Sequence, residues 1–195
     1  MAKPLIMGRQ EIARVYGIGV QAITTQWVPR GVLGYDSAAI VSGKAVWPGG
    51  LIVSLAKEPG KRGRQLNPEA LAALKVEQGA GYAPMKAEEM PRLVGSHEVA
   101  AIFGVPQIYV NQGMNAAQKM LPEPDWTISG SPVWILETIT AGVEHTEAVS
   151  AAARTSPGRW RADASVIEAL TVGAYDGPGS TIAARGVHAK AADSA

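Results

Sequence analysis

The chain has 195 residues, of which 47% are hydrophobic, and its formal net charge is +1. It contains no cysteine, so disulfide bonds and thiolate chemistry are excluded, and a zinc site would have to use histidine and carboxylate ligands. No apolar leader and no run of about 18 apolar residues occurs, so we expect a cytoplasmic, nucleoid-associated protein with no membrane partner. The length suits one large or two small domains.

One stretch of the chain occurs twice. Gly8 to Ile18 reads GRQEIARVYGI, and Gly95 to Val105 reads GSHEVAAIFGV, at an offset of 87 residues. At the same offset, Ser42 to Trp47 (SGKAVW) returns as Ser129 to Trp134 (SGSPVW). Two matching blocks at one spacing indicate an internal duplication. Each copy is large enough to bury a core of its own.

The first copy predicts two short helices. Arg9 to Tyr16 places its apolar side chains on or near one face, and Gly17 is typical of a helix end. A second helix is expected from Val20 to Val28, with Ile23 and Trp27 on its inner face. Two helices joined by a short turn that contains glycine form the helix-turn-helix pattern.

A β-hairpin is expected after the second helix. The β-prone runs AAIV and KAVW flank Ser42-Gly43, and Gly43 suits a tight hairpin turn. This hairpin is a candidate wing. We interpret Trp47, and Trp134 in the second copy, as core residues that anchor the wing rather than as stacking platforms.

The rest of the chain is predicted from capping residues and from the second copy. Asn67 and Pro68 are suited to begin a short helix within a basic linker. In the second copy, Pro106 opens the second helix, and a strand is expected from Trp126 to Ile128. The predicted division is residues 1–56 (first copy), 57–90 (basic linker with a short helix), 91–145 (second copy), 146–175 (C-terminal helical extension) and 176–195 (mobile tail).

The second copy, LVGSHEVAAIFGV followed by LPEPDWTISGSPVW, resembles the small winged helix-turn-helix domains of the MerR-like and excisionase class. The shared pattern is a Gly-x-x-Glu-apolar-Ala opening helix, a second helix, a Leu-Pro-x-Pro segment and a wing that ends in Pro-Val-Trp. The first copy keeps the opening helix and the wing but has LGYDS instead of the Leu-Pro-x-Pro segment.

The resemblance implies a mainly α fold with small β-hairpin wings, in two tandem winged helix-turn-helix domains. It also implies double-stranded DNA as the partner, with the second helix in the major groove and the wing against the backbone or minor groove.

The second helices hold the candidate base-reading residues. Gln and Asn side chains can read adenine in a bidentate way, and Thr can contact a thymine methyl group. Neither helix has an arginine at the position that usually reads guanine in this family. The candidates are Gln21, Thr24, Thr25 and Gln26 in the first copy, and Gln107, Tyr109, Asn111, Gln112 and Asn115 in the second. For both sets, a merely solvated face is the alternative.

Basic residues for phosphate contact lie mainly in the first part of the chain. Residues 1–90 carry 11 Lys and Arg against 7 Asp and Glu, whereas residues 91–195 carry 7 against 10. Phosphate attraction must come from such cations, because counterion release dominates DNA affinity. The candidates are Arg9, Arg14, Arg30, Lys44, Lys61, Arg62 and Arg64, and the last three could instead belong to a solvated linker.

Catalysis has little support in the sequence. His97, His145 and His188 are isolated, and no phosphate-cradling glycine motif or nucleophile elbow occurs. We interpret Glu11 and Glu98 as capping or pairing groups near a helix start rather than as catalytic groups. We therefore expect no enzymatic activity, no cofactor, no metal and no small-molecule ligand.

The sequence thus predicts a sequence-specific double-stranded DNA-binding protein, a transcriptional or mobile-element regulator of phage or plasmid type. Its two recognition helices would enter successive major grooves about 34–36 Å apart. Because the second helices differ, the site should be asymmetric or a direct repeat rather than a perfect palindrome. The alternative is a protein-interaction or assembly module, such as a phage structural or packaging component, built on degenerate copies. A homo-oligomer is compatible with both.

Overall fold

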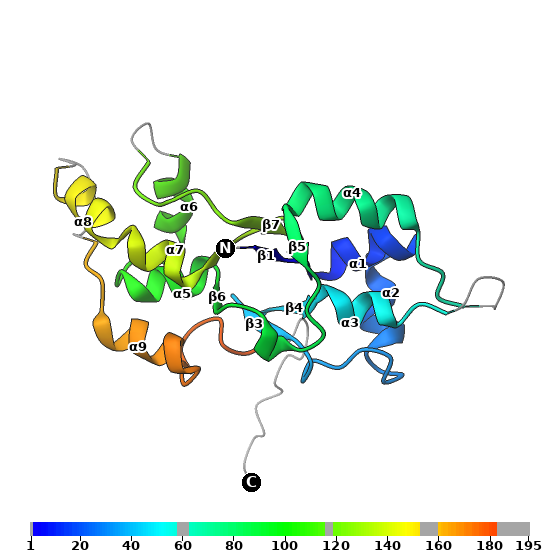
Figure 1. Cartoon of the computed structure of the whole chain (residues 1–195). Helices are drawn as coiled ribbons and strands as arrows, with labels where there is room; N and C mark the ends of the chain where they lie inside the picture. The colour runs from blue at the N-terminus through cyan, green and yellow to red at the C-terminus, as the bar shows by residue number, and fades with distance from the viewer. Residues whose placement is uncertain (1, 58–62, 116–118, 153–159, 183–195) are drawn as a thin grey trace, which may run out of the picture.

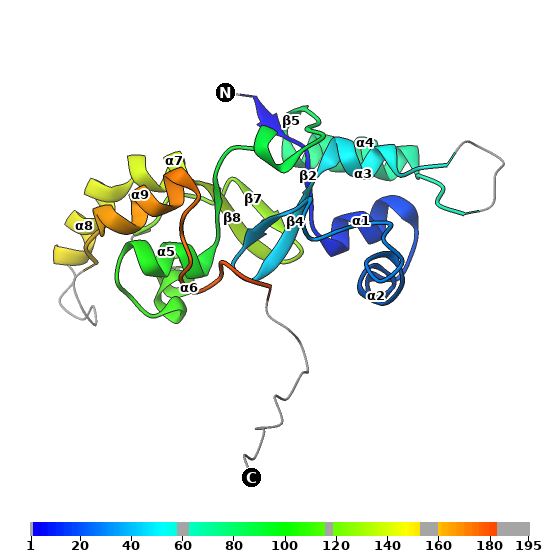
Figure 2. The same ribbon diagram turned by 90° about the horizontal axis from the view of Figure 1, so that it is seen from below.

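The structure is a computed structural model, and it describes residues 2–57, 63–115, 119–152 and 160–182. The fold is mixed α/β, and two groups of helices flank a central pair of β-hairpins (Figures 1 and 2). The expected combination of helices with small antiparallel hairpins is confirmed at this level. Among the described residues, none of the helices combines the length and the hydropathy that a bilayer-spanning segment needs.

The first half follows the predicted order and adds elements to it. Its elements are β1 (Lys3–Pro4), β2 (Ile6–Met7), α1 (Arg9–Tyr16), α2 (Val20–Ala22), the π-helical turn η1 (Ile23–Trp27), β3 (Ala39–Val41), β4 (Lys44–Pro48), α3 (Gly49–Ser54), α4 (Pro68–Gln78), β5 (Ala80–Tyr82) and the 3-10 turn η2 (Ala87–Glu89). The predicted second helix is therefore α-helical only over its first turn.

The second half repeats this order. Its elements are β6 (Leu93–Val94), α5 (Ser96–Ile102), α6 (Gln107–Asn115), β7 (Trp126–Ile128), β8 (Ser131–Ile135), α7 (Leu136–Ala141), α8 (Val143–Ala152) and α9 (Ala164–Val172). The bounds of β3, β4 and α3 return in β7, β8 and α7 at the offset of 87 residues that the sequence repeat predicts.

Each half builds a three-stranded antiparallel sheet with the same strand order, β2-β4-β3 and β6-β8-β7. The register is also the same, because Met7 pairs with Trp47 and Val94 pairs with Trp134. Both tryptophans are fully buried, at 0% exposure, so the prediction that they anchor the wings in the core is confirmed. A separate parallel pair joins β1 and β5.

The duplication extends beyond the wings to α4 and α9. The N–H group of Asn67, which caps α4, donates to the carbonyl of Val15 at 2.7 Å. The N–H group of Asp163, which caps α9, donates to the carbonyl of Ile102 at 2.8 Å. Each helix is thus docked on the last turn of the first helix of its own half. Through Leu71 and Leu74, α4 belongs to the core of the first half rather than to a linker.

Burial in the core of the first half also changes the pKa of Tyr16. Its hydroxyl donates to the carbonyl of Ile52 at 2.6 Å, and its ring meets the edge of Trp27 at a centroid distance of 4.9 Å. Burial raises the pKa of Tyr16 to about 12, and the nearby Arg64 cation partly offsets this rise. The phenol therefore stays protonated and holds the first helix against α3.

The two hairpin turns join the halves through reciprocal hydrogen bonds. The backbone N–H and the hydroxyl of Ser42 donate to the carboxylate of Glu98 at 2.8 and 2.7 Å. The same groups of Ser129 donate to the carboxylate of Glu11, both at 2.8 Å. Each serine Oγ in turn accepts the N–H of His97 (2.9 Å) or Gln10 (3.0 Å). Each wing tip therefore caps the first helix of the other half. We call this arrangement the wing interlock.

The turn backbone is shaped for this contact. Ser42 and Ser129 have positive φ angles of 49° and 47°, and each is followed by a glycine with φ 74°. These values match the type I′ turn of two-residue hairpins. Left-handed geometry costs a non-glycine residue about 1–2 kcal/mol, and the charged hydrogen bonds to the glutamates offset this cost.

The glycines that precede the first helices are required by the same contact. A Cβ atom on Gly8 would overlap Ser129 Oγ, and a Cβ atom on Gly95 would overlap Ser42 Oγ. The amides of Gly8 and Gly95 also donate to Glu11 and Glu98, at 3.0 and 2.9 Å. The predicted structural role of both glutamates is confirmed, because their carboxylates are held by these bonds.

A shared hydrophobic cluster lies beneath the wing interlock. It draws on both hairpins and on the strands that enter them. Its buried members are Ile6, Val41, Val46, Met90, Trp126, Ile128 and Val133. Because each half gives the other the same contact that it receives, the halves are related by a local two-fold axis, as in an isologous dimer.

The last described residues also differ from expectation. The sequence predicts a mobile tail from residue 176, but the N–H of Gly43 donates to the carbonyl of Gly179 at 2.8 Å. Residues 176–182 therefore lie against the tip of the first wing. Residues 183–195 of the predicted tail lie outside the described part of the chain.

Replacement of Glu98 by alanine should lower the free energy of unfolding by about 2–4 kcal/mol, because buried amides would lose a charged acceptor. Glu98 is only 3% exposed, and it accepts from both Gly95 and Ser42. Urea unfolding measures the change. The control is Glu137→Ala, at an exposed site in the first turn of α7, which should cost less than about 1 kcal/mol. Equal effects of the two substitutions would contradict the wing interlock.

Candidate nucleic-acid interface

The second helix of the first half widens into a π-helical turn. The hydroxyls of Thr24 and Thr25 both donate to the carbonyl of Gln21, at 3.1 and 2.9 Å. Such back-bonding from threonine competes with regular helix hydrogen bonds. Ile23 and Trp27 are buried, as predicted, so the opposite face turns outward. Gln21, Thr25 and Gln26 are exposed on that face, and Thr24 is half-buried.

Four predicted contact residues gather at one concavity of about 630 Å³ between this helix and the first wing. Arg9 reaches it from the start of α1, Gln21 and Thr24 from the second helix, and Lys44 from the start of β4. Tyr35 lines it too, and its ring stacks on Trp47 with centroids 6.0 Å apart. The concavity therefore combines two cations with polar and aromatic side chains.

A second cavity, of about 310 Å³, lies between the two wings at the start of both second helices. Arg9, Gln21 and Lys44 line this cavity as well, and Gln107 joins them from the start of α6. The ammonium of Lys44 donates to the hydroxyl of Ser131 across the two halves. The structure thus brings together residues of both copies that the sequence places in separate helices and in a hairpin.

His97, which is isolated from other histidines in the sequence, is a cavity residue in the structure. It lines the cavity between the two wings, and its Nδ1 atom is buried without a hydrogen-bond partner among the described residues. Gln10 stands at the equivalent position of the first copy and lines the same cavity. The sequence did hold a signal for this cavity residue, because the equivalent positions Gln10 and His97 are polar in both copies and lie at the start of the first helix.

The remaining second-copy candidates do not join this group. Tyr109 is half-buried and packs on the core of the second half. Asn111, Gln112 and Asn115 are exposed along α6, and the Asn115 side chain donates to the carbonyl of Asn111 at 2.9 Å. Among the described residues, none of these three lines a cavity with Arg9 or Lys44.

The other basic candidates are dispersed. Arg30 is exposed beyond η1, and Arg14 pairs with Glu77 at 2.6 Å. Arg64 turns toward the protein instead: its Nε donates to the carbonyl of Leu55 at 3.0 Å, and its guanidinium lies 5.9 Å from the ring centre of Trp27. Lys61 and Arg62 lie outside the described residues.

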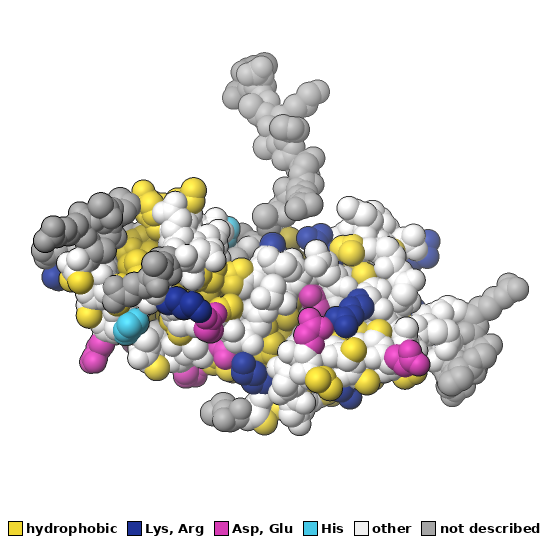
Figure 3. Space-filling view, turned by 90° about the horizontal axis from the view of Figure 1, so that it is seen from above, with side chains coloured by type: hydrophobic (Ala, Val, Ile, Leu, Met, Phe, Trp, Pro, Cys, Tyr) yellow, Lys and Arg dark blue, Asp and Glu magenta, His cyan; other side chains and the backbone are white. Residues whose placement is uncertain are grey.

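The charge pattern of the surface is mixed. On the face seen in Figure 3, Lys and Arg side chains are scattered, some of them next to Asp and Glu, and they form no continuous basic stripe. Within the described residues, no group of three or more histidines and carboxylates is placed to hold a metal ion. Any phosphate contact on this surface would therefore rest on a few separate cations.

The wings differ from the expectation that the resemblance gives. A wing that contacts a DNA backbone presents its tip to solvent, but here both Ser-Gly tips are held by glutamates of the opposite half. Ser42 and Gly43 line the larger concavity beside Lys44, but the N–H and hydroxyl of Ser42 and the N–H of Gly43 are already hydrogen-bonded within the molecule. No family model, curated protein or solved structure matches this chain.

Arg64→Ala should lower the free energy of unfolding by about 1–2 kcal/mol, because a charged hydrogen bond and a cation–π contact would be lost. It should leave any DNA affinity unchanged. Chemical denaturation and a binding titration measure the two effects. Arg30→Ala, at an exposed site, is the control and should change stability by less than about 0.5 kcal/mol. A loss of DNA affinity without a loss of stability in Arg64→Ala would contradict this assignment.

Proposed function

We propose that the protein is a sequence-specific double-stranded DNA-binding regulator, active at the nucleoid and built from two tandem winged helix-turn-helix domains. The observation that carries the proposal is the convergence of Arg9, Gln21, Thr24 and Lys44 on one concavity. Cations position a protein on phosphates, whereas Gln and Thr side chains read base edges. This pairing of roles is what a groove-facing surface requires.

The local two-fold axis bears on the form of the target. Two modules related by such an axis meet a duplex in opposite directions, so the target would be an inverted rather than a direct repeat. The two halves of the target would still differ, because Ile108 occupies the position of Gln21 in the second copy. The proposed target is therefore an imperfect inverted repeat. A separation of about 34–36 Å between the two reading helices stays a prediction.

An assembly module is the second candidate, and one observation favours it. Ile108 is 62% exposed at the start of α6, where a polar reading residue would be expected. An exposed isoleucine suits a protein partner, although it could also meet a thymine methyl group. The second half is also the more acidic half of the chain. In this alternative, the second copy binds a protein partner instead of DNA.

The decisive experiment is a salt series on the full chain with DNA selected from a random pool. DNA binding predicts a clearly negative slope of log K against log salt. The double variant Arg9→Gln, Lys44→Gln should reduce the magnitude of this slope by about 1.8, because each lost phosphate contact removes about 0.9. The charge-matched control Lys75→Gln, Lys86→Gln, at exposed sites outside both cavities, should leave it unchanged.

A slope near zero for the unmodified chain would refute DNA binding. Self-association in sedimentation that Ile108→Glu abolishes would then support the assembly module. Equal slopes for the two double variants would show that the concavity is not the contact surface.

A further inference from the structure

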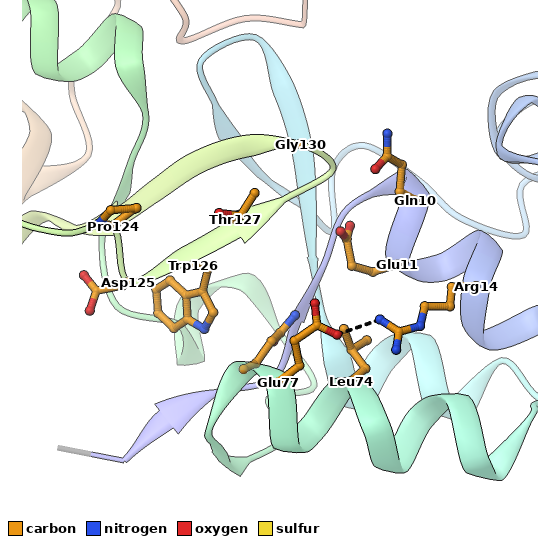
Figure 4. Close-up of a pocket in the computed structure, with 11 residues that line it drawn as sticks. Gln10, Glu11, Arg14, Leu74, Glu77, Pro124, Asp125, Trp126, Thr127 and Gly130 are labelled. Carbon is orange, nitrogen blue, oxygen red and sulfur yellow. Dashed lines mark hydrogen bonds and ion pairs between the residues drawn. The ribbon is translucent and has the colours of Figure 1, made fainter. Parts of the chain in front are cut away.

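A third cavity, of about 580 Å³, lies between the two halves. It is separate from the two cavities that Arg9 and Lys44 line. One wall is formed by α1 and α4, and the other by β7 with the residues that precede and follow it (Figure 4). Gln10 and Glu11 lie at one end, and Asp125 and Trp126 at the other. Neither predicted base-reading set contributes a residue to it.

Unused hydrogen-bond donors are the first sign that this cavity takes a ligand. Trp126 is only 4% exposed, yet its indole Nε1–H has no partner among the described residues. The backbone N–H of Gly130, at the tip of the second wing, likewise has no described partner. The indole is the buried one of the two donors, and a buried donor without an acceptor costs free energy and calls for an explanation. The Gly130 amide is exposed, so it is free to meet an acceptor in the cavity.

The edge of β7 adds a third donor. β7 is an outer strand, and its middle residue Thr127 pairs with Pro132, which has no N–H. Because Ile128 and Ser131 flank the turn as the hydrogen-bonded pair, the N–H and carbonyl of Thr127 point away from β8. Thr127 lines the cavity. The wall therefore offers a short strand edge.

The charged groups of the cavity already have partners. Glu11 is held in the wing interlock, and Asp125 accepts from Ile135 and Thr138 and pairs with Lys3 at 3.3 Å. Glu77 pairs with Arg14. What remains unmatched is a set of neutral donors. A ligand that fits them presents neutral acceptors at backbone spacing, as an extended peptide does.

The other half of the molecule shows such a segment in the equivalent place. Pocket residues Ala39, Ile40 and Glu98 are the counterparts of Trp126, Thr127 and Glu11, and Tyr175 and Ser180 of the chain's own C-terminal segment line the same pocket. Between them, Gly179 accepts the N–H of Gly43 at 2.8 Å. A Cβ atom on Gly179 would overlap Glu98, so glycine is needed at that point.

The first half has no equivalent segment to lie against the second wing, because its chain takes another course after α4. After α9 the chain runs through residues 174–182 to the tip of the first wing. After α4 it turns at Gly79 into β5, which pairs with β1 instead. Gly130, the counterpart of Gly43, is left uncovered, and the cavity stays open beside it.

We propose that this cavity is a docking site for an extended, glycine-containing segment of a partner protein. The segment lies along β7 as residues 174–182 lie along the first wing. One carbonyl accepts the N–H of Gly130, and a neighbouring carbonyl accepts the indole N–H of Trp126. The glycine rests against Glu11 and Gln10, where a side chain would overlap the wing interlock. The proposal is independent of DNA binding.

The test uses the full, ¹⁵N-labelled chain and the synthetic peptide AYDGPGSTI, which has the sequence of residues 174–182. NMR titration should give saturable shifts of the Trp126 indole N–H and the Gly130 amide. Trp126→Phe keeps the ring but removes the donor, and should weaken binding about five- to tenfold. Trp160→Phe, a substitution of the same kind in the core of the second half, should leave binding unchanged.

A peptide with Gly179→Leu should not bind. Absence of saturable shifts at Trp126 and Gly130 would overturn the proposal. Shifts confined to Gly43 and Glu98 would also overturn it, because they would report exchange with the chain's own segment. Concentration-dependent shifts at Trp126 without peptide, together with a dimer in sedimentation, would identify a second copy as the occupant instead and would likewise overturn it.

Discussion

The structure depends on one interaction made twice, the capture of each Ser-Gly wing tip by the glutamate of the opposite half. A carboxylate that accepts three backbone and hydroxyl groups at 2.7–2.9 Å is a strong, directional acceptor. It sets the positive φ of Ser42, requires glycine at position 95 and brings the hydrophobic faces of both hairpins together. The two halves thereby become one pseudo-symmetric body rather than two modules on a linker.

This arrangement has two functional consequences. The tips of the wings are engaged within the molecule, so the proposed DNA surface rests on Arg9, on the second helix of the first half and on strand side chains beside the tip such as Lys44. The duplicated halves have also diverged at these surfaces. Gln21 of the first copy is replaced by Ile108 in the second, and Trp126 stands where the first half has Ala39. Symmetry maintains the scaffold, and the departures from symmetry mark the two candidate binding sites.

Sequence reasoning predicted the repeat, the first helices, the hairpins and the buried tryptophans, because each rests on local periodicity or on one turn residue. It did not predict that a wing contacts the other half. Gly8, Glu11 and Ser42 are identical in both copies, so the pattern fits a contact within one copy as well as a contact between copies. Sequence reasoning also did not predict that the Arg64 guanidinium lies over Trp27, because charge alone does not tell a phosphate contact from a cation stacked on an aromatic ring.

Distance measurement by electron paramagnetic resonance tests the wing interlock most directly, since the chain has no cysteine and accepts a labelled pair cleanly. Spin labels at Thr25→Cys and Gln112→Cys occupy equivalent exposed sites on the two second helices. The interlock predicts one narrow distance distribution that broadens when Glu11→Ala and Glu98→Ala are added. A broad distribution in the labelled chain without these changes, or a narrow one that survives both, would contradict it.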